Sequence, residues 1–166
     1  MSRGFVKESD QEELPIIPPR APLPAGVDNY VTPAGLQALQ SEKSGLEAEK
    51  SALPTNNEDE HRRATTVLDG KLALLNGRIS TARPIKLSDQ PADEVRFGAT
   101  VTLKNSGMKK PQTFQIVGVD EANVKEGKLA FTAPIVRAIT GLYAGETADF
   151  QLGGEVRKLE VLGIEY

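Results

Sequence analysis

Apolar residues recur at helical spacing along two stretches of the first half of the chain. In the first stretch the leucines follow the three- and seven-residue spacing of a coiled-coil seam: Leu36, Leu39, Leu46 and Leu53. The second stretch alternates steps of four and three: Leu68, Leu72, Leu75, Ile79 and Ala82. Each stripe covers only one face of its helix, so neither helix can bury its apolar side chains alone. The pattern therefore predicts two amphipathic helices that pack against each other.

Residues that start and stop helices delimit these two stretches. Thr32 is suited to cap a helix with Pro33 in its first turn. Pro54 ends the first helix and Pro84 the second, because proline cannot continue a helix. The short turn between the helices requires them to run antiparallel. Lys43 and Lys50 occupy the other seam positions, where their stems can cover apolar surface, so the hairpin should lean on the rest of the protein at its base.

The second half of the chain alternates or clusters branched and aromatic residues in a pattern typical of strands. Two longer candidates, 95–103 and 113–119, flank a turn at 105–107 and should pair antiparallel. Shorter strand candidates follow at 128–131, 147–151 and 157–164, with a short helix at 134–139. Several strands with one helix on a sheet face predict an α+β domain.

The first thirty residues differ from the rest in composition. Five of the eleven prolines lie between Pro15 and Pro24, which favours an extended or polyproline II arm. Pro15 to Arg20 also fits the P-x-x-P-x-R pattern that aromatic grooves bind, although an arm laid over its own protein explains the prolines equally well. We thus divide the chain into an arm (1–30), a helical hairpin (31–84) with an acidic tip at 55–61, and a β-rich domain (85–166).

Composition excludes several classes of function. The chain has 20 basic and 23 acidic residues and a net charge of −3, which argues against a basic nucleic-acid surface over the whole protein. It has no cysteine and one histidine, which excludes disulfides, thiolate sites and multi-histidine metal sites. No apolar run is long enough for a membrane span, and the first residues lack a signal-peptide stretch. We expect a soluble cytoplasmic protein without a membrane partner.

Chemistry-bearing residues gather at the turn of the hairpin. Nucleophile, P-loop, dinucleotide and zinc-protease motifs are absent from the sequence, and His61 falls on the predicted seam. Glu58, Asp59 and Glu60 precede it. Such acids complement a helix dipole, but at the end of a projecting rod they can also enter a partner's cavity and help hold a divalent metal. The basic pair Lys109-Lys110 fits an ordinary solvated loop or a phosphate contact.

Several strings in this order resemble the C-terminal domain of bacterial GreA/GreB transcript-cleavage factors. They cover nearly all of residues 95–166: VRFGATVTL (95–103), FQIVGVDEAN (114–123), PIVRAITG (134–141), GG (153–154) and VLGIEY (161–166). Upstream, YVTPAGL (30–36), DGKL (69–72) and STA (80–82) are similar to parts of that family's coiled coil.

The resemblance implies an FKBP-like C-terminal domain that binds at the rim of the secondary channel of RNA polymerase, and a coiled coil that reaches toward the catalytic centre. Such a factor is not itself an enzyme and has no cofactor of its own. Two tip acids, here Glu58 with either Asp59 or Glu60, would support a Mg²⁺ ion shared with the polymerase active site while the polymerase hydrolyses backtracked RNA. Contact with nascent RNA or DNA would arise only within the polymerase complex, and we expect a monomer.

Two departures from the family leave alternatives open. The tip TNNEDEH (55–61) lacks the family's leading Asp, and both helices are shorter by about two turns, or about 11 Å of reach. The chain is then either a cleavage stimulator or, like the Rnk type of regulator, a secondary-channel binder that competes with other factors without promoting cleavage. A prolyl isomerase would need an aromatic pocket in the β domain, and a plain adaptor would not bind core polymerase.

Overall fold

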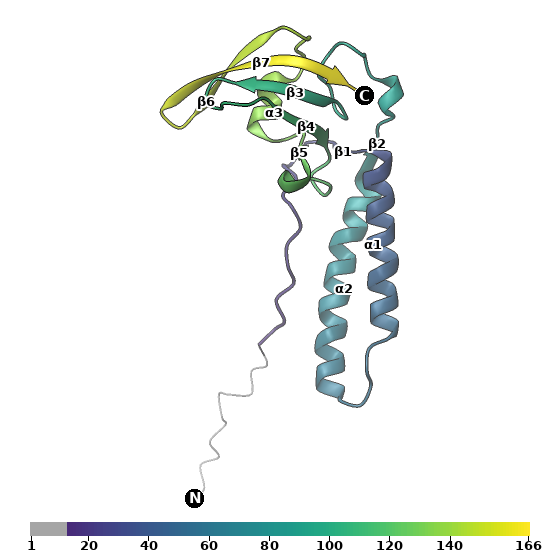
Figure 1. Ribbon diagram of the computed structural model, residues 1–166. Coiled ribbons are helices and arrows are strands. Elements are labelled where there is room, and N and C mark those ends of the chain that lie inside the picture. The colour runs from purple at the N-terminus through teal and green to yellow at the C-terminus, as the bar shows by residue number, and fades with distance from the viewer. Residues whose placement is uncertain (1–12) are drawn as a thin grey trace, which may run out of the picture.

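A computed structural model describes residues 13–166 as a helical rod attached to a β-rich domain (Figure 1). The first twelve residues of the predicted arm lie outside this range. No helix among the described residues is both long enough and apolar enough to cross a membrane. From Glu13 the chain runs without regular secondary structure to a turn at Ala25 and Gly26, and then enters the first strand, β1 (Asn29–Val31).

The rod consists of two helices, α1 (Pro33–Ser51) and α2 (Glu58–Thr81). Thr32 caps α1 as predicted, since its hydroxyl accepts a hydrogen bond of 2.9 Å from the Gly35 amide. Leu39, Leu68 and Leu75 are buried along the seam, while Leu46 and Ile79 are partly buried beside it. The predicted pairing of two amphipathic helices is therefore confirmed.

A two-stranded parallel sheet closes the base of the rod. Strand β1 enters α1, and strand β2 (Ala82–Pro84) leaves α2; Asn29 pairs with Ala82 and Val31 with Pro84. Val31 is buried in the same cluster as Leu39 and Leu75. The hairpin thus has its largest apolar cluster at the end that meets the β domain.

The β domain contains a five-stranded sheet in the order β5-β4-β3-β7-β6. Its strands are β3 (Thr100–Asn105), β4 (Gln112–Val117), β5 (Lys128–Ala130), β6 (Thr147–Leu152) and β7 (Glu155–Glu165). The β4–β5 pair is parallel and the other three pairs are antiparallel. The short helices are η2 (Leu87–Asp89), η3 (Val124–Glu126) and α3 (Pro134–Ile139).

Helix α3 supplies Val136 and Ile139 to the core, which they share with buried residues of the central strands such as Leu103, Ile116 and Leu159. The α+β class, with a helical hairpin and a β-rich domain bearing a short helix, is confirmed. One predicted strand differs at its start. Residues 95–99 are not a ladder strand, because Gly98 has a φ of +89° that interrupts the extended backbone, and β3 begins at Thr100.

Candidate functional site

The predicted acidic tip lies at the end of the rod farthest from the β domain (Figure 1). A short connection, 52–57, joins the helices there, and Asn57 caps α2. Its side-chain oxygen accepts hydrogen bonds from the amides of Asp59 at 3.1 Å and Glu60 at 3.2 Å. Glu58, Asp59 and Glu60 therefore form the first turn of α2, where the positive end of the helix dipole favours carboxylates.

The three carboxylates have different surroundings. Asp59 forms an ion pair of 3.1 Å with Arg62, and both side chains are mostly exposed. Within residues 13–166, neither Glu58 nor Glu60 makes an ion pair. The tip thus presents negative charge to solvent, partly balanced on one side by Arg62.

The tip acids do not make a metal site by themselves. Nowhere in residues 13–166 do three or more His, Asp or Glu side chains come together in a group that could hold a metal ion. Because Mg²⁺ requires about six oxygen ligands in near-octahedral geometry, one or two tip carboxylates can serve it only beside ligands from another molecule. The donor chemistry fits Mg²⁺, and the ligand number requires a partner.

His61 has a structural role at the turn. Its Nδ1 lies 3.0 Å from the carbonyl oxygen of Pro54, and since that oxygen only accepts, the bond requires a proton on Nδ1. This contact ties the start of α2 to the connection after α1. Further along the rod, Lys50 reaches across to Asp69 at 2.6 Å. His61 and Lys50, two of the polar residues predicted on the seam, therefore connect the two helices.

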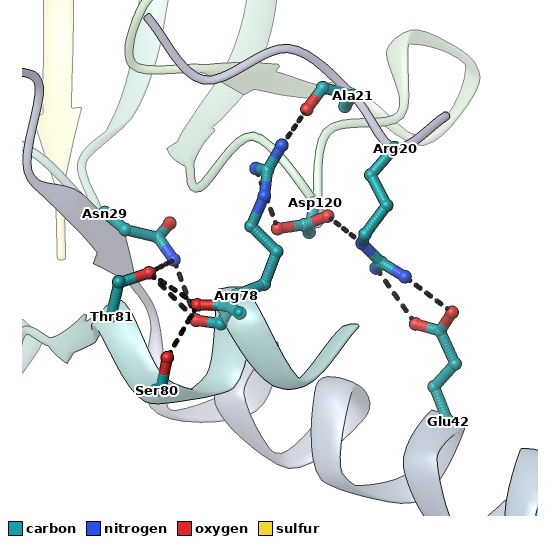
Figure 2. Close-up of polar contacts among 9 residues, drawn as sticks. Arg20, Ala21, Asn29, Glu42, Arg78, Ser80, Thr81 and Asp120 are labelled. Carbon is teal, nitrogen blue, oxygen red and sulfur yellow. Dashed lines mark hydrogen bonds and ion pairs between the residues drawn. The ribbon is translucent and has the colours of Figure 1, made fainter. Parts of the chain in front are cut away.

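A second polar centre, not predicted from the sequence, lies where the arm, the hairpin and the β domain meet (Figure 2). Asp120, in the loop after β4, pairs with Arg20 of the arm at 2.9 Å and with Arg78 of α2 at 3.2 Å. Arg20 also pairs with Glu42 of α1 at 2.8 Å. These partners are up to 100 residues apart in sequence, so no local pattern signals their contact.

Three aromatic rings also meet where the hairpin adjoins the β domain. Tyr30 of β1 lies with its ring centroid 5.8 Å from Phe97 and 5.5 Å from Phe131. Together with residues such as Arg96 and Thr140, they line a cavity of about 310 Å³. The cavity includes a ring from outside the β domain, which sequence reasoning confined to that domain could not find. Lys109 and Lys110 are exposed in the connection between β3 and β4.

Comparison with known proteins links the chain to one family. The family described as "Transcription elongation factor, GreA/GreB, C-term" matches residues 90–166. GreA of Brucella anthropi is 30% identical over 151 residues, covering 82% of this chain and 96% of that protein. GreA of Hyphomonas neptunium is 37% identical over 99 residues, 60% of this chain, and the match spans 63% of that relative's length.

The similarities to solved structures are more distant. The GreA/GreB factor from Nitrosomonas europaea is 16% identical, with a TM-score of 0.40 over 84% of this chain and 99% of that one. Gfh1 of Thermus aquaticus is 15% identical, with the same TM-score and coverage. The assignment to a family therefore rests on the sequence matches and not on the solved structures. One sequence match extends over both the hairpin and the β domain. The chain belongs to the GreA/GreB family of transcription elongation factors.

Proposed function

We propose that this chain binds RNA polymerase, inserts its helical hairpin into the secondary channel, and stimulates cleavage of backtracked RNA through Glu58, Asp59 and Glu60. The observation that carries the proposal is the display of three carboxylates in the first turn of α2, at the free end of the rod. This function would place the protein in the cytoplasm, where it acts as a monomer.

The shape of the hairpin suits insertion into a channel. Helix α2 has 24 residues and is therefore about 36 Å long at 1.5 Å per residue. Helix α1 has 19 residues, about 28 Å, and packs beside α2, to which only a short connection joins it. A rod of two packed helices can carry its tip into a channel that would not admit the β domain.

The tip supports metal chemistry in a partner's site. A Mg²⁺ ion bound in the polymerase would supply activation of the water that hydrolyses the RNA, and the tip carboxylates would help hold it. The contribution of this chain is to position carboxylate oxygens: the Asn57 cap fixes the direction of the first turn, and the bond between His61 and Pro54 fixes the connection before it. The hydrolysis belongs to the polymerase, so the chain is a stimulator and not an enzyme.

One observation favours a second candidate, a channel binder that does not promote cleavage. Asp59 is already paired with Arg62, so it must leave a partner before it can ligate a metal. Exposed pairs of this kind contribute about 0.2–1 kcal/mol, which is small beside a metal–carboxylate bond. Ion pairing at the tip therefore weakens metal support without preventing it, and the reach of the rod decides between the two candidates.

The test is a cleavage assay on a backtracked elongation complex assembled with the cognate polymerase and Mg²⁺. Wild-type protein should shorten the RNA, and a variant with Glu58, Asp59 and Glu60 all changed to Ala should bind without shortening it. A control with Asp89, Asp93 and Asp149 changed to Ala loses the same charge at exposed positions outside the hairpin. Binding with no cleavage by any form supports the second candidate, whereas absence of binding contradicts both.

A further inference from the structure

Arg20, Glu42, Arg78 and Asp120 form a joint between the β domain and the hairpin. The guanidinium of Arg20 lies at its centre. Its Nε donates to Oδ1 of Asp120 at 2.9 Å, and its two terminal nitrogens donate to the Glu42 carboxylate at 2.8 and 3.0 Å (Figure 2). The hydrogen bonds to Glu42, together with the one to Asp120, raise the pKa of Arg20 although its burial opposes the shift. One arm residue therefore bridges a loop of the β domain and a helix of the rod.

Asp120 uses both of its oxygens in this joint. Oδ2 pairs with Arg78 of α2 at 3.2 Å, and the Asp120 side chain is only 7% exposed. Arg78 in turn donates to the carbonyl oxygen of Ala21 in the arm. Charge-assisted hydrogen bonds are strong, and a buried carboxylate that loses its partners is costly. The four elements are therefore coupled, because each arginine contacts both Asp120 and a second segment.

Asp120 and Arg78 lie close to the base of the rod, but Glu42, the other partner of Arg20, lies away from the point where the rod is attached. At the base, Thr32 donates to Glu121 at 2.6 Å, and Gly118 lies directly against the carbonyl oxygen of Tyr30. Glu42 lies nine residues after Pro33, about 14 Å further along α1. A rod held only at its base can swing, whereas a second attachment on one side resists that motion.

The residues of the arm that precede Arg20 also lie along the rod. Ile17 packs so closely on Gly70 of α2 that a Cβ there would lie 2.1 Å from the Ile17 side chain. Gly70 precedes Arg78 by eight residues, about 12 Å along the helix. The arm thus follows α2 over two turns. The arginine of the P-x-x-P-x-R pattern binds Glu42 and Asp120 of the same chain. The pattern therefore makes intramolecular contacts.

We propose that residues 15–21 act as a brace that holds the helical hairpin at a fixed orientation to the β domain, with Arg20 as its positioning residue. The brace determines the direction in which the tip points relative to the surface that the β domain presents. It acts within the free protein and does not depend on the proposed cleavage function. Polyproline segments suit this role because they are already extended and lose little entropy when they bind.

Spin labels can measure the orientation directly, because the chain has no cysteine. Ser51 at the end of α1 and Thr147 in β6 are both exposed, and each can be changed to Cys and labelled in one molecule. Helix α1 has 19 residues, so a swing of about 15° at its base moves Ser51 by about 7 Å. Pulsed electron paramagnetic resonance resolves such a change in the distance between the two labels.

We expect one narrow distance distribution in the otherwise unchanged chain. Arg20→Gln, and a chain that begins at residue 22, should each broaden the distribution or shift it by several ångströms. Arg137→Gln is the matched control, since Arg137 is an exposed arginine of α3. Circular dichroism checks that the helices remain intact. If both brace variants keep the distribution of the control, the brace does not exist. Glu42→Gln, which leaves the Arg20–Asp120 pair in place, should broaden it less than Arg20→Gln.

Discussion

The phenol of Tyr166, the last residue of the sequence, donates a hydrogen bond to the carbonyl oxygen of Glu94, 72 residues earlier. The phenol oxygen of Tyr166 in turn accepts a hydrogen bond from the amide of Arg96 at 2.9 Å. The segment around Glu94 also pairs with Tyr143 through a β-bridge. The end of β7 is therefore fastened to the segment that connects the rod to the sheet.

Tyr166→Phe should destabilise the protein by about 1 kcal/mol, the usual contribution of a hydrogen bond. The variant keeps the ring but leaves the Arg96 amide without its phenol acceptor. Urea unfolding of both proteins, followed by circular dichroism, measures the difference in the free energy of unfolding. Tyr143→Phe is a suitable control, because Tyr143 is exposed. An equal effect of the two substitutions would remove the assigned role of Tyr166.

The contribution of Tyr166 to the free energy of unfolding should fall at high pH. Burial raises the pKa of Tyr166 above its ordinary value of 10, although the Arg96 amide opposes the shift. Because the folded-state pKa is the higher one, the stabilisation is complete below about pH 10 and is lost as the pH rises through the folded-state pKa. The difference in the free energy of unfolding between wild type and Tyr166→Phe should therefore shrink above about pH 10. A pH-independent difference would show that the phenol titrates alike in both states.

Gly118→Ala should weaken the attachment of the rod. A Cβ at Gly118 would lie 2.6 Å from the carbonyl oxygen of Tyr30, so β1 would have to move away from the β domain. Overpacking of this kind costs about 1–3 kcal/mol. Gly45→Ala is the matched control: Gly45 is within α1 with nothing near its missing Cβ, and alanine there should stabilise the helix by up to about 1 kcal/mol. Thermal unfolding should show opposite shifts, and shifts of the same sign would contradict the assigned contact.

Local patterns were sufficient to predict the rod. Thr32 and Pro33 start α1 as expected, and the leucines at 68 and 75 are buried, because helix spacing and caps depend on residues close in sequence. The strand predicted at 95–103 starts later, as β3, because a single glycine, Gly98, interrupts a run that otherwise has strand composition. Glycine permits this positive φ, and the Leu87 side chain packs against Gly98, a contact that the composition of the run does not signal.

The joint could not be predicted because its partners are distant in sequence. Asp120 and Arg20 are 100 residues apart, and each appears in the sequence as an ordinary surface charge. The aromatic group likewise combines Tyr30 with Phe97 and Phe131. The acidic tip was visible from sequence alone, because all three acids are consecutive and follow a turn, but whether it supports cleavage is still a prediction.

Asn57→Ala should fray the tip. The Asn57 side chain satisfies the amides of Asp59 and Glu60, and loss of such a cap costs about 0.5–2 kcal/mol. Amide hydrogen exchange in the first turn of α2 should accelerate, while exchange in the β domain should be unchanged. Asn57→Asp, which retains a capping oxygen, should keep the slow exchange. Equal protection in the alanine and aspartate variants would contradict the capping role.

Asp59→Asn should reduce stimulated cleavage more than either Glu58→Gln or Glu60→Gln, if the tip acts on a metal as proposed. Successive residues of an α-helix are about 100° apart around the axis, so Glu58 and Glu60 are about 200° apart and point to opposite sides. Any pair of tip carboxylates that serves one metal from the formed turn must therefore include Asp59. Cleavage rates at limiting Mg²⁺ distinguish the variants, and the more damaging of the two Gln substitutions identifies the second carboxylate. A full rate in Asp59→Asn with loss in both Gln variants would show that the first turn does not keep its helical form in the polymerase.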